Sequence, residues 1–432
     1  MLFRSAALTR FWVIRSHWRE AYAWFEAALA LPRAPARSLV RAEAMNAAHS
    51  MAHWEVDVAQ RRSQMAECVT IFREAGPAGR RGLAYALITL GDLTHFQGDF
   101  APTLIMLKES VRLFRELGDR WGLALALHKT AATLDPLVNY QPRGEQGLSP
   151  LPELAPAARN DHTAERALFE ESLALFRAVG DRWGQAGNLG ALGHLYFCWG
   201  DREAGRAMFE ENITILREFG DVEGVGSGFA HLGRDALAHD ELEPAARLLD
   251  ASLAIHRDLY QNDDDAVMDL LAVEIARRRG DHAQALRLSS RVLGALRKLG
   301  NRDFVASALD GQGRIARSQG DAAAAHALHR EALLMRREAG HPITLAHSFH
   351  ALALLVAARA GQAERAARLF GAAEPYHAAL YAYFFALPIW RAEHEQAVAA
   401  LQAQLGQARA AALWAEGEAM TLEQAFAYAL ET

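Results

Sequence analysis

The 432-residue sequence has little cysteine, no long apolar run and no excess of positive charge, and each absence excludes a class of protein. The two cysteines, Cys68 and Cys198, are far apart and form no CxxC pair, which excludes a disulfide framework or a cysteine zinc site. The longest apolar runs, such as 381–390, are too short to span a bilayer. A net charge of −6 argues against nucleic-acid binding, which needs clustered excess lysine and arginine. We therefore expect a cytoplasmic protein without direct nucleic-acid or membrane partners.

Motifs for nucleotide binding and nucleophilic catalysis are also missing. No GxxxxGK[ST] segment occurs, so the sequence has no phosphate loop of that kind. Nothing resembles a nucleophile elbow, and no Ser-His-Asp or Cys-His arrangement can be argued from the spacing. The N-terminal residues carry arginines at helical spacing, which favours an amphipathic helix over a signal peptide. We expect no enzyme activity and no cofactor.

A sequence segment that occurs twice indicates how the chain is organised. Residues 110–127 return as residues 172–189, with Gly-Asp-Arg-Trp-Gly at the same place and an offset of 62 residues. Elsewhere a Gly-Asp break or its equivalent recurs every 40 residues, within one residue, at Gly200, His239, Gly280 and Gly320. The repeated segment exceeds this period by 22 residues, which match a proline-rich segment at about 137–160. We expect that segment to be an inserted surface loop, because proline at this density does not fit a helix interior.

The segments between the breaks are amphipathic and rich in helix-forming residues. Apolar side chains follow the i, i+3, i+4, i+7 pattern, as in residues 201–220. Aspartate at a break can cap the next helix, and the glycine before it can end the previous one. Two such helices cannot bury their apolar faces alone, so hairpins must stack, and Trp121 and Trp183 are expected to join neighbouring repeats. The sequence predicts an all-α, right-handed superhelical solenoid of helix hairpins about 40 residues long.

The hairpins carry a recurrent L-G-x-x-Y/A…G-D…A/G…F/L pattern. It is most complete at Leu192, Gly193, Tyr196, Gly200, Gly205 and Phe209. This pattern resembles the tetratricopeptide repeat, although the usual period is 34 residues. The longer period, with segments 16–31, 364–380 and 391–430, is similar to the sensor region of maltose-regulator-like, LuxR-type signalling-ATPase transcription regulators. The resemblance implies an N-terminal helical start at 1–36, repeats at 37–380 and C-terminal capping helices at 381–432.

Complete regulators of that group place a nucleotide-binding module before this region, often with a helix-turn-helix DNA reader at one end. This chain has neither a phosphate loop nor, after Trp414, more than about one short helix. The resemblance therefore implies a non-catalytic scaffold or sensor that binds a protein, peptide or small effector in bacterial signalling or transcription regulation. The alternative is a fragment of an ATP-dependent transcription regulator whose nucleotide-binding and DNA-binding parts are absent from this chain.

The concave side of such a solenoid is lined mainly by the first helix of each hairpin. By register, the early half places aromatic, imidazole and acidic residues there: Tyr85, Asp92, His95, Phe96, His128, His194 and Phe197. The later half places arginine and glutamate there: Arg234, Glu274, Arg277, Arg314 and Arg317. Arginine forks and aromatic faces suit an extended peptide with acidic groups, and a small anionic ligand is a second option. A third interpretation is a polar helix face without a ligand.

Four histidines raise the hypothesis of a metal-dependent enzyme. His326 and His329 are three residues apart on one expected helix, as are His347 and His350 on the next. Imidazoles at this spacing can share a metal ion, but no third ligand type is fixed nearby, and alanine- and histidine-rich helices scatter imidazoles over solvated faces. We expect no metal. Glutamates and aspartates at helical spacing from arginines have the pattern of solvated surface pairs.

Overall fold

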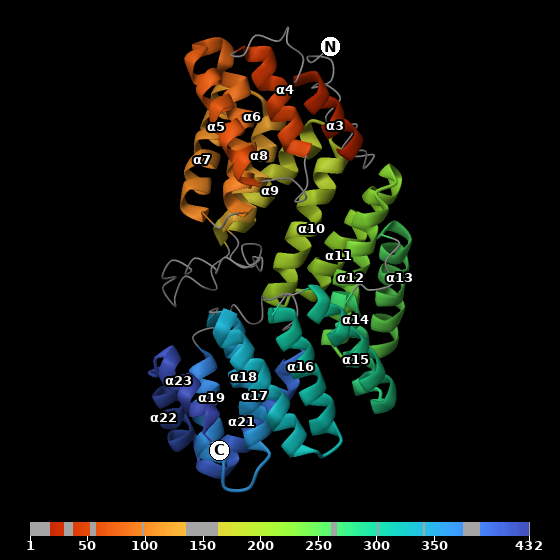
Figure 1. Cartoon of the computed structure of the whole chain (residues 1–432), viewed down its shortest axis with the longest axis vertical. Helices are drawn as coiled ribbons and strands as arrows, with labels where there is room; N and C mark the ends of the chain where they lie inside the picture. The colour runs from red at the N-terminus through yellow and green to blue at the C-terminus, as the bar shows by residue number, and fades with distance from the viewer. Residues whose placement is uncertain are drawn as a thin grey trace. The chain divides into compact units, whose positions relative to one another are not determined.

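The computed structural model describes residues 18–29, 38–51, 58–96, 99–134, 163–260, 266–299, 302–339, 342–374 and 389–431. Every regular element in these ranges is helical (Figure 1). The contacts divide the chain into two units, with the boundary between Val225 and Gly226 inside helix α12. The predicted all-α class is confirmed.

The first unit begins with three helices and continues as paired helices. α6 packs on α7, α8 on α9 and α10 on α11. The elements are α3 (Trp18–Leu29), α4 (Leu39–Met51), α5 (Val58–Glu74), the 3-10 turn η1 (Gly76–Gly79), α6 (Arg80–Phe96), α7 (Phe100–Leu117), α8 (Arg120–Leu134), α9 (Thr163–Ala178), α10 (Arg182–Trp199) and α11 (Arg202–Phe219).

The second unit repeats the same pairing and ends in a helical cap. α14 packs on α15, α16 on α17 and α18 on α19, and α22 packs on α19. Its helices are α12 (Val222–Ala238), α13 (Leu242–Tyr260), α14 (Ala266–Arg278), α15 (His282–Leu299), α16 (Arg302–Ser318), α17 (Ala322–Ala339), α18 (Pro342–Ala357), α19 (Ala363–Ala373), α21 (Ile389–Leu405), α22 (Gln407–Glu418) and α23 (Leu422–Leu430).

The Gly-Asp breaks form the turns that the sequence predicts. Gly200 ends α10 with a φ of 80°, and the N–H of Asp201 donates to the carbonyl of Tyr196 at 2.9 Å. The Asp201 carboxylate then accepts the N–H of Ala204 at 3.1 Å and caps α11. The equivalent turn after α12 has no glycine, and Asp240 itself takes the left-handed conformation, with a φ of 60°. A short polar side chain tolerates this conformation, so the period continues through the break.

Residues of the repeated segment also form the contacts between neighbouring helices. Gly122 on α8 faces the ring of Phe114 on α7, and a Cβ there would lie 2.3 Å from a ring carbon. Gly184 on α10 faces Phe176 on α9 in the same way, at 2.6 Å. Trp121 donates its indole N–H to Asp181 at 2.6 Å, which ties α8 to the turn before α10. Both copies of the segment therefore contain the same contact, a phenylalanine ring packed against a glycine of the next helix.

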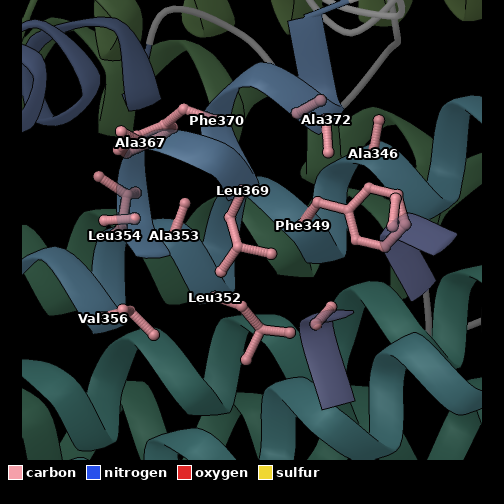
Figure 2. Close-up of a cluster of buried hydrophobic side chains, with 14 of the residues drawn as sticks. Ala346, Phe349, Leu352, Ala353, Leu354, Val356, Ala367, Leu369, Phe370 and Ala372 are labelled. Atoms are coloured by element: carbon pink, nitrogen blue, oxygen red, sulfur yellow. The ribbon is translucent and has the colours of Figure 1, made fainter. Parts of the chain in front are cut away.

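The largest buried cluster described in the second unit joins the hairpin of α18 and α19 to helices α21, α22 and α23. Figure 2 shows side chains of α18 and α19 that belong to this cluster, including Phe349, Leu352 and Leu369. The ring of Trp414 on α22 stacks on Phe370 with centroids 5.8 Å apart. Helix α22 therefore buries apolar surface of the hairpin that α18 and α19 form.

Several expectations lie outside the described residues. The proline-rich segment at 137–160 falls there, as do the predicted domain limits at residues 36 and 380, which stay predictions. Within the closing segment, Thr421 and Gln424 form a capping box at the start of α23.

Candidate functional site

Tyr85 on α6 lies in a packed contact between hairpins. Its hydroxyl donates to Asp119 Oδ2 at 3.3 Å, and its ring meets Phe114 edge-on with centroids 4.8 Å apart. The guanidinium of Arg81 lies 5.7 Å from the ring centroid. Burial, reinforced by the charge of Asp119, raises the pKa of the Tyr85 hydroxyl, so it remains a neutral donor at physiological pH. This side chain holds neighbouring elements together.

Asp92 and His95 on α6 contact the next first helix, α8. Asp92 Oδ2 lies 2.9 Å from Lys129 Nζ, with both side chains about one-third exposed. His95 Nδ1 lies 3.5 Å from the hydroxyl of Thr133. The register prediction therefore placed both residues on the face where consecutive first helices meet. Phe96 is the last residue of α6, and its side chain lies outside what the structure describes.

His128 on α8 continues this row toward α10. Its Nδ1 lies 3.3 Å from Asn188 Oδ1, and its ring meets Phe169 edge-on at 5.4 Å between centroids. Burial, helped by the charge of Lys129, lowers the pKa of His128 to about 4. The ring is therefore neutral at physiological pH and serves as a packed polar contact.

The remaining candidates of the first unit lie on α10. Phe197 stacks on Phe209 with centroids 5.4 Å apart, and its ring lies against Gly205, where a Cβ would come within 2.4 Å. His194 is half-buried. Phe197 is thus a contact between α10 and α11, not an open aromatic face.

Arg234 on α12 is buried, with 3% of its surface exposed. Its Nη2 lies 2.5 Å from Nδ1 of His231, one turn earlier on the same helix. Arg234 therefore presents little surface to a ligand.

The other four candidates of the second unit form one charged cluster around Glu274 on α14. This carboxylate is 3% exposed and accepts from Arg277 at 2.7 and 3.0 Å and from Arg278 at 3.0 Å. Arg314 on α16 forms a third ion pair with it at 3.5 Å. Burial alone would raise the pKa of Glu274, but the charge of Arg314 and the hydrogen bonds from Arg277 hold it at about 2. Glu274 therefore anchors the arginines as a permanent anion.

A second carboxylate reaches this cluster from the far end of the sequence. Glu393 on α21 accepts from Arg277 Nη2 at 3.3 Å and also pairs with Arg317 on α16. Arg277 additionally donates to the hydroxyl of Ser318 at 3.0 Å. We call Arg277, Arg314 and Arg317 the arginine face. It is the part of the candidate set that already holds a carboxylate from a distant helix.

A small pocket adjoins the arginine face between α16, α17 and α18. Its lining residues are Arg314, Arg317, His329, His350, Ala351 and Leu354. Its volume of about 10 Å³ has room for no more than about one water molecule, so it adds no ligand site to the arginine face.

Two of the four histidines of the metal hypothesis, His329 and His350, have separate partners. His329 is 1% exposed, and its Nδ1 lies 2.8 Å from Asp310. His350 Nε2 lies 3.1 Å from Nδ1 of His394 on α21. Burial, followed by the charge of Arg359, lowers the pKa of His326. Across the described residues, no three His, Cys, Asp or Glu side chains gather as metal ligands.

The protonation state of Cys68 and the apolarity of the helices limit the kinds of site to consider. Cys68 is buried, and burial raises the pKa of its thiol to about 12, so it is not a thiolate at neutral pH. Among the helices that the structure describes, none combines the length and apolarity needed to cross a bilayer.

Sequence reasoning missed Glu393 and the burial of Glu274. The spacing of Glu274 with Arg277 and Arg278 is that of a solvated surface pair, and in this instance the expectation was wrong, since Glu274 is 3% exposed. Glu393 lies 116 residues after Arg277, and no local sequence pattern predicts a contact at that separation. The run of arginines on successive first helices was the available signal, and it identified the positive side of the contact only.

A family model and one solved structure agree with this architecture. A tetratricopeptide repeat model matches residues 264–338, which include α14 to α17. Aspartyl phosphate phosphatase F from Bacillus subtilis is structurally similar, with a TM-score of 0.51 and 11% identity over 90% of this chain and 95% of that one. A Rap protein complexed with Competence and Sporulation Factor gives 0.48 and 13% over 91% and 98%. BtubC from P. vanneervenii gives 0.39 and 15% over 67% and 95%. No curated protein matches the sequence.

Proposed function

Because residues 264–338 carry tetratricopeptide repeats and the described chain folds as helix hairpins, we propose that the protein is a non-catalytic scaffold that binds an acidic protein segment on its arginine face. Helical repeats of this type suggest a protein-interaction scaffold, since stacked hairpins expose a row of first helices for binding. The arginine face lies on two of these helices, α14 and α16, within the matched repeats.

One observation carries the proposal: Arg277 and Arg317 hold the carboxylate of Glu393, which a helix supplies from outside the matched repeats. Guanidinium groups recognise carboxylates through paired, charge-assisted hydrogen bonds. The side chains of the arginine face are 10–23% exposed, so they are accessible yet shielded from full solvent screening. A glutamate or aspartate on a partner helix would find the same donors.

The charge balance also favours an acidic partner. Three guanidinium groups of the arginine face meet two carboxylates, Glu274 and Glu393. Arg278 pairs in addition with Asp240, whose side chain is 75% exposed. Among these pairs four arginines meet three carboxylates, so positive charge prevails locally although the whole chain is acidic.

We place this scaffold in bacterial signalling or transcription regulation, in the cytoplasm. The support is the resemblance of segments 16–31, 364–380 and 391–430 to the sensor region of signalling-ATPase regulators, together with the helices α3, α19 and α21 to α23 in those segments. In this role the bound acidic segment, or a small anionic effector in its place, is the signal that the module senses. The alternative of a regulator fragment assigns the same binding face to a longer protein.

The test uses the full chain and a matched pair of labelled peptides. Both are alanine-rich helices about 15 residues long, one with glutamate at every fourth position and one with glutamine there. Fluorescence anisotropy is expected to show binding of the glutamate peptide that weakens as salt is added, because the contact is ionic. Arg317→Gln is expected to weaken binding about tenfold, the effect of losing roughly one charge-assisted hydrogen bond.

Arg302→Gln is the matched control. Arg302 lies on the same helix, its side chain is 60% exposed and it pairs with Glu338, so its loss should leave peptide binding unchanged. If both peptides bind equally, or if both arginine variants act alike, the arginine face does not select carboxylates and the proposal is wrong. Competition by free glutamate or phosphate at low concentration would instead assign the face to a small effector.

A further inference from the structure

The helix α21 is held differently at its two ends. Toward its C-terminus, Leu401 is 2% exposed, and Ala397 and Leu405 pack against the same apolar cluster as α18 and α19. Toward its N-terminus, the described contacts are polar or aromatic and come from Glu393 and His394. The C-terminal half is thus anchored in the apolar cluster, whereas Glu393, near the N-terminus, is held by ion pairs that a competing carboxylate can replace.

Glu393 is the residue by which α21 reaches the arginine face. Its side chain is 27% exposed, which is more than that of Glu274, the buried anion of the same cluster at 3%. The neighbouring His394 lies against His350, Phe370 and Trp414, with ring centroids 5.1, 5.0 and 6.0 Å away. Glu274 is thus the buried counter-ion of Arg277 and Arg314, and Glu393 is the more exposed counter-ion of Arg277 and Arg317.

Burial and charge give the two carboxylates different roles. Removing Glu274 would leave arginines without their fixed counter-ion, which is costly in a shielded site. Removing Glu393 from contact leaves Arg277 and Arg314 paired with Glu274, and takes from Arg277 and Arg317 the carboxylate that α21 supplies. Release of Glu393 therefore raises the attraction of the arginine face for an incoming anion.

We propose that the N-terminal part of α21 is a resident occupant of the arginine face, and that an acidic partner helix binds by displacing Glu393. This inference rests on the proposed function, because it takes the arginine face as the binding site. The partner supplies a carboxylate to Arg277 and Arg317 in place of the one that α21 gives up, so the number of ion pairs is conserved. Binding of the partner and release of this part of α21 are then coupled in one equilibrium. The protein responds to the partner by a change in the position of this part of α21.

The proposal predicts a gain of affinity from a mutation that removes a native contact. A ligand that binds only the open form has an apparent dissociation constant equal to the intrinsic one divided by the open fraction. Glu393→Gln weakens the internal contact and raises the open fraction. We expect the glutamate peptide to bind this variant about tenfold more tightly than the wild-type chain, the scale of one partly buried charged hydrogen bond.

The matched control is Glu395→Gln, which makes the same charge change on the same helix at an exposed position. It should bind the peptide as the wild type does. Circular dichroism and thermal unfolding of each full-length variant establish that all of them are folded before binding is compared.

Three outcomes separate this inference from the proposed function. Tighter binding by Glu393→Gln alone, still sensitive to Arg317→Gln, supports both. Equal affinities for the wild type and Glu393→Gln, with binding still lost on Arg317→Gln, overturn the displacement and leave the proposed function standing. If Glu393→Gln binds the glutamate and glutamine peptides equally, the arginine face does not recognise carboxylates and both proposals fail.

Discussion

The substitution Asp310→Asn tests how the second unit is held together. Asp310 on α16 is 1% exposed and pairs with Arg336 on α17, which is also 1% exposed. Arg336 donates in addition to the hydroxyls of Ser348 at 2.7 Å and Ser307 at 3.2 Å. His329 completes the network through its 2.8 Å contact with Asp310. Two helix hairpins therefore share one buried ionic network.

The magnitude follows from burial. Burial would raise the pKa of Asp310, but the charge of Arg336 and the contact with His329 hold it below its usual range, so the native carboxylate is charged. Replacing it with an amide leaves Arg336 charged and buried without a counter-ion. Breaking a buried pair in this way costs about 3–5 kcal/mol, and we expect about 3 kcal/mol because asparagine still accepts one hydrogen bond.

The assay is urea unfolding of the full chain followed by far-ultraviolet circular dichroism. With a slope of about 2 kcal/mol per molar urea, the midpoint of the affected transition should fall by about 1.5 M. Because the chain forms two units, the curve is analysed for separate transitions before a free energy is assigned. Glu338→Gln is the control: its side chain is 65% exposed beside Arg302, and its loss should cost less than about 1 kcal/mol. Equal losses in the two variants would refute the reasoning from burial.

Two further predictions concern the first unit. Gly184→Ala places a Cβ 2.6 Å from the buried ring of Phe176 and should lower the free energy of unfolding by about 1–3 kcal/mol. Gly294→Ala, with no atom within 4 Å of its added Cβ, should not destabilise in the same urea assay, and equal effects would argue against the glycine–aromatic contact. His128 has a native pKa of about 4, below its ordinary 6.5, so the unfolded chain takes up the proton first and stability falls as pH drops from 6.5 to 4. His128→Gln should remove about 3 kcal/mol of that dependence in unfolding measured across this range, and an unchanged pH profile would contradict the assignment.

The periodic part of the fold was predictable because neighbouring residues in the sequence determine each turn. A glycine that must take a positive φ and an aspartate that caps the next helix mark each turn within two residues, as at Gly200 and Asp201. The break at Asp240, which lacks glycine, could still be located because the 40-residue spacing continues through it. Neighbour contacts in a repeat array then follow from the order of the hairpins.

The candidate site was only partly predictable, because its decisive contacts are not local. Arg277, Arg314 and Arg317 could be placed on one face from register alone. Their anion, Glu393, depends on how α21 packs after the repeats, and sequence spacing contains no information about that packing. Tyr85 and Phe197 were correctly placed on first helices, but their rings are used for contacts between elements, because large aromatic side chains fill the space that facing glycines leave.

Hydrogen–deuterium exchange of the full chain, with and without the glutamate peptide, tests the central claim most directly. The account predicts slower exchange in residues 274–278 and 314–318, where the arginine face lies, together with faster exchange in residues 389–394 of α21. Unchanged exchange in the first two segments while the peptide is bound would show that the arginine face is not the binding site and would contradict the account.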